Sequence, residues 1–469
     1  MTGTIGYGLS SRESRRDFWK RFAVLLLVIA GQNVIVYGVN LLDNIMIGRI
    51  ENAEAAISGI FIVNQIQFLL QMIVGGIADG AGVLCSRFWG EGNIRDIKKT
   101  SSTAMAFGVA LSGLLTAAAL LFPRQVLSLF TDKPAVIEEA AKYLYIVCFT
   151  YIIFTVTQVL LGVLRSVECA FIGFVNSCAA FVVNLTLNYI LIFGHCGFPA
   201  MGVRGAAIAT LISRVVELVI VLVYIAFFDK KLKLKLKDFF VFDRDITGKF
   251  MRYSLPVLLS ATSWGIAMGL QTAILGHLEE AVISANSIAS TVFQIVTVFT
   301  YASATAASIM IGKTIGEGGL DSGGDPALLK AEVKHRTVRL ELLFLGIGAL
   351  TGAALFLLKD VVIGFYEISP ETKQMAVDFM TVLSVTVVGT AYQMPSLAGI
   401  LRGGGDTKFI LYNDIVFMWG IVLPASFLAA FVLKLSPVII FICLKSDQIL
   451  KCFVAIVKVN RFRWIKKLQ

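Results

Sequence analysis

One carboxylate stands inside an otherwise apolar stretch near the start of the chain. Asp43 lies in NLLDNIMIG, and Asn40 precedes it by about one helical turn on the same face. A carboxylate in hydrocarbon is costly unless it is paired, hydrated or protonated. Because burial raises the pKa of a carboxyl group, Asp43 is a candidate for binding and releasing a proton near neutral pH. The alternative is that Asp43 lies hydrated at the outer membrane interface.

Two amides further along have the spacing of one helix face. Asn184 and Asn188 in VVNLTLNYILIFG are four residues apart, so they either contribute to an ion site or bond to a neighbouring helix. Thr210 in GAAIATLIS is a weaker candidate of the same kind. Arg214 and Glu217 are three residues apart in that same stretch, and we expect a structural ion pair between them.

Other polar residues are scattered through apolar segments. Neutral amides among abundant Phe and Met suit an adaptable cavity for amphipathic molecules, although each amide can equally bond between helices. Asp414 is a further candidate, and we expect it to answer Arg402 or Lys408 if it is paired. The candidates for the cavity are Asn40, Asn64, Gln65, Gln158, Asn286 and Gln294.

The composition predicts an all-α membrane protein that crosses the lipid bilayer many times. Hydrophobic residues make up 57% of the chain and charged residues 15%, whereas soluble domains carry about 25% charge. The apolar runs are continuous and of spanning length, which favours helices over strands. We predict twelve transmembrane helices, at roughly 22–47, 55–86, 100–122, 137–165, 169–194, 205–228, 249–275, 282–312, 335–357, 371–400, 409–433 and 436–457.

The net charge of +10 is concentrated in predicted loops and ends. Lys and Arg gather before the first span, in the stretch 229–249 and after the last span, which predicts that both termini are cytoplasmic in a bacterial inner membrane. This distribution disfavours nucleic acid as a partner. The alternating KKLKLKLK within 229–249 fits a strand or, as we prefer, a basic linker at the membrane surface.

The sequence contains an internal repeat of about half its length. YGVNLLDNIMIGRIENAEAAISGI at 37–60 aligns with GIAMGLQTAILGHLEEAVISANSI at 265–288, which places Asp43 opposite Gln271. Gly90-Glu91-Gly92 then matches Gly316-Glu317-Gly318, and GVLRSVE at 162 matches GILRGGG at 399. Such repeats indicate two lobes with a transport route between them. We assign the N-lobe to 1–228, the linker to 229–249 and the C-lobe to 250–469.

Catalytic and cofactor motifs find no support in the sequence. Gly312-Lys313-Thr314 resembles the end of a phosphate-binding loop, but the required glycine is Ala307. The three histidines share no spacing for a metal or a catalytic base, and no Ser/His/Asp arrangement is evident. We therefore expect no enzyme activity and no cofactor.

Several segments in this order resemble the multidrug and toxic compound extrusion family, of the bacterial DinF-like or a related branch. They are NLLDNIMIG, GEGN, GVLRS, NLTLN, GVRGAAIAT, SLPVLL and GILRGGGDTK. The resemblance covers nearly the whole chain. It implies two six-helix bundles related by a pseudo-twofold axis, and export of small, often cationic drugs against H+ or Na+. It further implies a cation site for H+ or Na+ at Asp43, Asn184, Asn188 and Thr210.

The chain departs from the family pattern at three places. Trp264 stands where some members have a seventh-helix Glu, Asn188 stands where some have Asp, and the first helix lacks the Pro seen in relatives. The first departure argues against a sodium site in the C-lobe. We expect a monomer.

The main alternative is a flippase for lipid-linked precursors of the same superfamily. A flippase should line its cavity with basic residues for phosphates, and only Arg214, Arg49 and Arg165 are placed to reach inside. A membrane-embedded enzyme is disfavoured by the lack of converging acids or a catalytic His.

Overall fold

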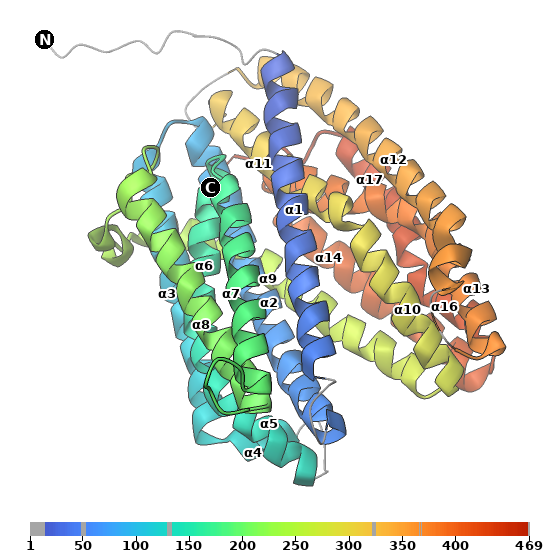
Figure 1. The fold of residues 1–469 in the computed structure, drawn as a ribbon. Coiled ribbons are helices and arrows are strands. Elements are labelled where there is room, and N and C mark those ends of the chain that lie inside the picture. The colour runs from blue at the N-terminus through green and yellow to red at the C-terminus, as the bar shows by residue number, and fades with distance from the viewer. Residues whose placement is uncertain are drawn as a thin grey trace, which may run out of the picture.

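Helices make up almost all of the described chain. The computed structural model describes residues 15–47, 53–128, 134–320, 325–364, 366 and 368–467. In these ranges, nine helices are long and apolar enough to cross a membrane, and two bent helix pairs pass the same test as single spans. A twelfth segment follows as α16 (Pro437–Lys445) and α17 (Asp447–Asn460). The predicted all-α membrane fold of twelve segments is confirmed (Figure 1).

The first six segments form the N-lobe. Its fourth segment bends by 49° between α5 and α6, at Cys148. The elements are α1 (Arg15–Ile47), α2 (Ala53–Gly90), α3 (Ile94–Leu121), the short α4 (Pro123–Ser128), α5 (Pro134–Val147), α6 (Phe149–Ser166), α7 (Phe171–Phe193) and α8 (Val203–Val223), which continues as η1 (Tyr224–Phe228).

The last six segments form the C-lobe, beside the N-lobe in Figure 1. Its second segment bends by 43° between α10 and α11. Besides α16 and α17, its elements are α9 (Arg244–Gly276), α10 (Glu280–Val296), α11 (Val298–Glu317), α12 (Pro326–Gly364), α13 (Pro370–Met394), η3 (Pro395–Leu401), α14 (Thr407–Phe417), η4 (Met418–Val422), α15 (Leu423–Phe427) and η5 (Leu428–Val432).

Proline affects the C-lobe helices unequally. Pro256 lies inside the continuous helix α9, whereas Pro395 opens the wide turns of η3 and Pro424 follows those of η4. Proline removes one backbone donor and crowds the preceding turn, so a locally widened helix is a common response. Two of these three prolines, Pro395 and Pro424, therefore lie where a C-lobe helix departs from regular α geometry.

The linker docks on the N-lobe. Leu232 and Leu234 are buried in the hydrophobic core beside α2, α3 and α6, which explains why Lys and Leu alternate in this segment. Lys98 Nζ on α3 lies 2.8 Å from a carboxylate oxygen of Asp238, in the 3-10 turn η2 (Leu236–Phe240). The segment is not a strand, and it packs against the N-lobe through its leucines.

The helix α9 begins inside the stretch that the sequence assigned to the linker. The Asp243 side chain accepts hydrogen bonds from the backbone N–H of Asp245 and of Ile246, and so caps the helix at Arg244. Lys99 Nζ lies 2.6 Å from the same carboxylate. The hydrogen bond from Lys99 lowers the pKa of Asp243 below its usual value.

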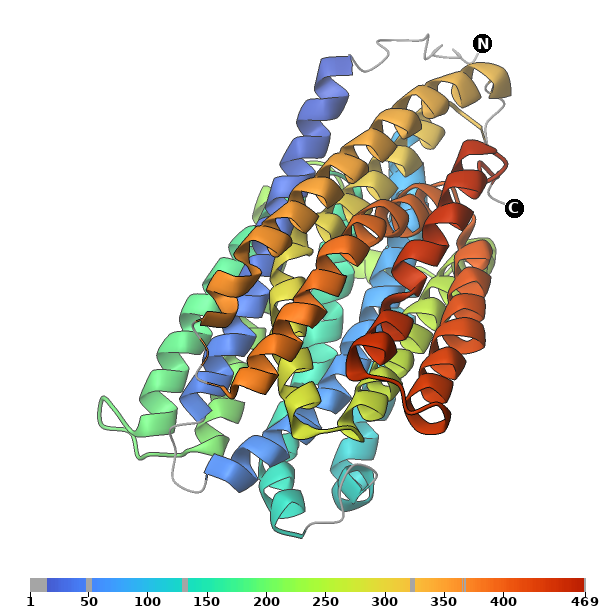
Figure 2. The same cartoon turned by 90° about the vertical axis from the view of Figure 1, so that its right-hand side faces the viewer.

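The start of α1 and the end of α17 lie at one end of the molecule, which we call the basic end (Figure 2). The linker contacts Lys98 near the start of α3. The tail after α17 is held at the basic end. Trp464 is fully buried and donates from Nε1 to the carbonyl of Val459 at 2.8 Å. Lys466 Nζ lies 2.6 Å from Asp406, and the Lys466 carbonyl accepts a hydrogen bond from Arg87 of α2. The tail therefore bridges the two lobes.

The helices α2 and α11 cross at a pair of glycines that are equivalent in the repeat. A Cβ atom built on Gly90 would lie 3.0 Å from the Cα of Gly316, and one built on Gly316 would lie 3.0 Å from the Cα of Gly90. Only glycine permits backbones to approach this closely. The two lobes thus meet in a symmetric contact at the basic end.

Candidate functional site

Asn184 and Asn188 lie on a buried face of α7. Their side chains are 5% and 1% exposed, and the Asn188 amide donates to the Asn184 Oδ1 at 3.0 Å. The predicted common face is therefore confirmed. A buried carbonyl oxygen of an amide is a ligand suited to a small hard cation.

The helix α1 runs parallel to α7 in a fixed register. A Cβ built on Gly31 would lie 2.9 Å from the ring of Phe174, and one built on Gly38 would lie 3.9 Å from the ring of Phe181. Both pairs have the same separation in sequence. Continued along α1, this register brings the backbone at position 43 level with Thr186, midway between the two asparagines. The Asp43 and Asn40 side chains themselves lie outside the described residues.

The helix α8 brings Thr210 to the same level. The Gly205 backbone packs on the carbonyl of Leu191, with α7 and α8 antiparallel. Five residues further along α8 is Thr210, and five residues back along α7 is Thr186. The Thr210 hydroxyl donates to the carbonyl of Ala206 at 3.0 Å, which leaves its lone pairs open. The three helices of the predicted cation site therefore converge at one depth.

Arg214 and Glu217 form the expected ion pair. One guanidinium nitrogen of Arg214 donates to both carboxylate oxygens of Glu217, at 2.8 and 3.0 Å. The Arg214 side chain also lies 5.1 Å from the ring centroid of Phe154. A cation held in this way is not free to bind a phosphate, which weighs against the flippase alternative.

Asp414 has a different partner from the one predicted. Neither Arg402 nor Lys408 pairs with it; Lys451 Nζ lies 2.9 Å from its carboxylate, and the Ser260 hydroxyl donates to it. Lys451 also lies 3.5 Å from Asp447. The expectation failed because Lys451 comes from α17, a helix far away in sequence, and Arg402 turns instead to the N-lobe.

The predicted cavity residues other than Asn40, which lies on α1, are dispersed over three helices. Asn64 and Gln294 are exposed, while Gln65, Gln158 and Asn286 are half-buried. The side-chain Oδ1 of Asn286 accepts a weak hydrogen bond from the Ser290 hydroxyl at 3.3 Å. Asn64 and Gln65 lie on α2, Gln158 on α6, and Asn286 and Gln294 on α10, so they belong to both lobes.

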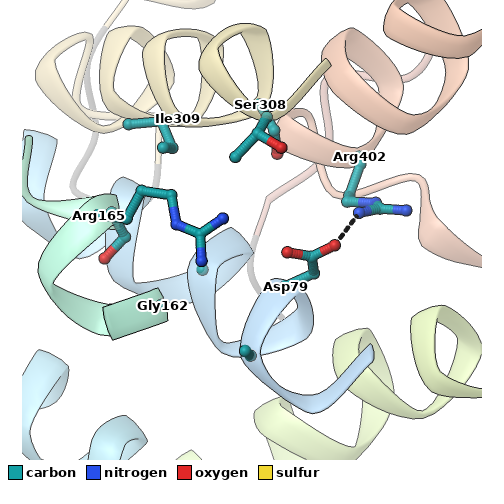
Figure 3. A pocket seen from close by; sticks show the side chains of 10 residues that line it. Asp79, Gly162, Arg165, Ser308, Ile309 and Arg402 are labelled. Atoms are coloured by element: carbon teal, nitrogen blue, oxygen red, sulfur yellow. Dashed lines mark hydrogen bonds and ion pairs between the residues drawn. The ribbon is translucent and has the colours of Figure 1, made fainter. Parts of the chain in front are cut away.

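The basic end of the seam is closed by ion pairs between the lobes. Lys313 of α11 lies 2.7 Å from Glu168, in the turn before α7. Asp79 of α2 lies 2.7 Å from Arg402, directly after η3 (Figure 3). These contacts, the tail and the glycine crossing hold the lobes together at this end.

Asp79 and Glu168 did not emerge from the sequence as site residues. Asp79 was open to the same argument as Asp43, since it is an acid within a predicted span. Arg402 and Arg165 were marked by the repeat itself, because GVLRS and GILRG align the two arginines. The pairing of Asp79 with Arg402 and of Glu168 with Lys313 depends on contacts across the lobes, which sequence spacing does not reveal.

Comparisons with known proteins give one family. The MatE family model matches residues 29–190 and 256–428, which is most of the chain. The "Uncharacterized transporter YisQ" of Bacillus subtilis is 24% identical, with 91% of this chain and 90% of that protein covered. The "Probable multidrug resistance protein NorM" of Listeria monocytogenes is 22% identical, with 98% and 96% covered.

Solved structures share the fold. A MOP superfamily transporter from Pyrococcus furiosus, described as having a binding pocket of reverse polarity, has a TM-score of 0.84 at 19% identity, with 96% of this chain and 97% of that chain covered. A MATE crystal structure in complex with MaL6 has a TM-score of 0.83 at 19% identity, with 95% and 97% covered. This chain is therefore a multi-pass membrane protein of the MatE family of transporters, and not an enzyme.

Proposed function

We propose that this protein exports amphipathic, often cationic, small molecules in exchange for inward movement of H+ or Na+. The observation that carries the proposal is the convergence of α1 at position 43, the buried asparagine pair of α7 and Thr210 of α8 at one depth of the N-lobe. Similarity to proteins described as multidrug resistance proteins supports the choice of cargo.

The exchange follows from alternating access. With Asp43 deprotonated, the N-lobe holds a negative charge that favours a cationic substrate from the cytoplasmic side. Protonation or Na+ binding from outside removes that charge and releases the substrate. The membrane potential assists, because moving one charge across 100 mV is worth about 2.3 kcal/mol.

The proposed orientation places the basic end in the cytoplasm of a bacterial cell. The Lys and Arg residues of the linker and tail support this assignment through the positive-inside bias. The closed basic end then corresponds to a state with the cytoplasmic side shut. Proteolysis of the linker in sealed vesicles of known orientation tests the assignment.

Dye efflux from vesicles tests the coupling residue. Asp43→Asn should abolish extrusion of a cationic dye under an imposed pH gradient, because the amide cannot release a proton. Asp360→Asn, an exposed acid at the end of α12, is the matched control and should export like the wild type. Equal export by Asp43→Asn and the wild type would refute the assignment.

The choice of ion needs a separate measurement. Proteoliposomes with a proton-sensitive and a sodium-sensitive dye, loaded side by side, report which ion enters as substrate leaves. Asn184→Ala should weaken Na+ coupling more than H+ coupling, since an amide oxygen is a ligand for Na+ and is not required to protonate a carboxylate. An unchanged Na+ response in this variant would leave Asn184 outside the site.

A further inference from the structure

A small cavity lies between the lobes at the basic end, next to the Asp79–Arg402 pair. It measures about 30 Å³ and is lined from α2, α6, α11 and the turn after η3. A single water needs about 10–15 Å³ on this measure, so the cavity holds roughly two waters or one bare monatomic ion. A substrate of drug size does not fit.

Two arginines and one acid face this cavity. Arg165 points its guanidinium toward the middle of the cavity from α6, and Arg402 approaches from the other lobe (Figure 3). Asp79 lies beside Arg402 and is bonded to it. The formal charge of the three side chains is therefore positive by one unit.

The polar groups at the cavity are incompletely satisfied by the protein. The Nε of Arg402 is buried and has no hydrogen-bond partner among the described residues. Arg165 likewise forms no ion pair with a described residue, although it lines the same cavity as Asp79 and a second arginine. Two cations that share one acid leave an excess positive charge beside the cavity, and the cost of that excess falls when an anion enters.

The repeat explains why two positive groups meet here. Arg165 and Arg402 occupy equivalent positions in GVLRS and GILRG, and both line the cavity between the lobes. The partner acid is present only once: the position in α11 that corresponds to Asp79 is Thr305, which also lines the cavity. Duplication thus supplies two cations and one anion to the same space.

We propose that this cavity is a binding site for a small monovalent anion of halide type, held between Arg165 and Arg402 with the Ser308 hydroxyl alongside. The anion neutralises the excess charge and joins an N-lobe arginine to a C-lobe arginine. Its binding therefore stabilises the state in which the basic end is closed. This site is separate from the cation site near Asn184 and from the substrate.

Thermal unfolding of the full-length protein in detergent tests the site with chloride as the probe. At constant ionic strength, chloride should raise the unfolding midpoint of the wild type above its value in gluconate, which is too large to enter. Arg165→Gln should weaken the apparent chloride affinity by about tenfold or more, because one of two cationic ligands is lost. Asp79→Asn should tighten it by about tenfold, because the competing carboxylate is neutralised.

The opposite signs of these two variants separate binding from general damage. Arg204→Gln, an exposed arginine at the start of α8, is the matched control and should respond to chloride like the wild type. Equal midpoints of the wild type in chloride and gluconate, or an unchanged chloride response in Arg165→Gln, would overturn the proposal. If Arg165→Gln does not fold, Asp79→Asn decides alone: tighter binding supports the site, and unchanged or weaker binding overturns it.

Crystallographic bromide gives a second test. Anomalous signal between Arg165 and Arg402 is expected in the wild type, and its absence at saturating bromide would contradict the proposal. Neither experiment involves drug transport, so the anion site stands or falls apart from the proposed antiport.

Discussion

The two lobes are copies in sequence, yet they use their buried charges in different ways. In the N-lobe, Arg214 and Glu217 are three residues apart on α8 and satisfy each other locally. In the C-lobe, Lys451 of α17 joins Asp414 of α14, which also accepts a hydrogen bond from Ser260 of α9. One lobe has an ion pair within a helix, and the other has an ionic network across three helices.

This difference indicates where each lobe is free to change. A network across helices ties the C-lobe together, because separating any helix exposes a charge in a region of low dielectric. The local pair of the N-lobe makes no such demand, because both of its charges lie on α8. The C-lobe network therefore resists separation of its three helices more than the N-lobe pair resists separation of its own.

The largest effect is expected from removing the cation of the C-lobe network. Lys451→Met leaves Asp414 and Asp447 without their shared partner, so the free energy of unfolding should fall by about 3–5 kcal/mol. Lys458→Met is the matched control on the same helix, since Asp406 keeps Lys466 when Lys458 is lost. Unfolding by SDS titration in mixed micelles measures both. Equal losses in the two variants would show that the sharing of Lys451 by two acids adds no stability beyond that of one redundant ion pair.

A smaller loss is expected where the lobes are equivalent. Gly90→Ala and Gly316→Ala each place a methyl group against the opposite backbone at the helix crossing, which should cost about 1–3 kcal/mol and favour opening of the basic end. Reaction of an introduced cysteine with a water-soluble thiol reagent reports the opening. Gly75→Ala on α2 meets no atom within 4 Å and should leave the reactivity unchanged. A strong effect from one glycine and none from the other would break the symmetry of the contact.

The local pair of the N-lobe should matter less for stability than the C-lobe network. Glu217→Gln keeps a hydrogen-bond acceptor for Arg214, whose side chain is 22% exposed and rests on Phe154. The expected loss in the free energy of unfolding is about 1 kcal/mol in the same SDS titration. A loss as large as that of Lys451→Met would show that the N-lobe is tied together as firmly as the C-lobe.

The smallest effect on stability is expected in the linker, which packs against the N-lobe. The hydrogen bond from Lys99 lowers the pKa of Asp243 in the folded protein. The ionised Asp243 carboxylate therefore stabilises the fold fully at every pH above the pKa of Asp in the unfolded chain, which is about 4. The contribution is lost as the pH falls through the lower folded pKa. Hydrogen exchange of the linker amides, corrected for intrinsic rates, should stay slow from pH 8 to about pH 5 and rise only below about pH 4. Asp243→Asn should raise exchange already at pH 7; loss of protection in the wild type by pH 6 would contradict this account.

The chain of residues carried the fold in considerable detail. Continuous apolar runs predicted the twelve segments. In hydrocarbon, a helix satisfies all of its backbone hydrogen bonds within its own segment, so an apolar run of spanning length forms a helix. Spacing of four predicted the shared face of Asn184 and Asn188, and spacing of three predicted the Arg214–Glu217 pair. These properties are local, so the periodicity of a helix is enough to derive them.

Contacts between segments were decided by the tertiary structure alone. The sequence predicted that Arg402 or Lys408 would pair with Asp414. In the structure, Arg402 binds Asp79 in the other lobe, and Lys451 pairs with Asp414. The sequence left open what the leucines of the basic linker contact, and in the structure they pack into the N-lobe core. Which acid pairs with which base depends on the distances between helices that are far apart in the chain, and on how the two lobes meet. Neither can be derived from residue spacing along one helix.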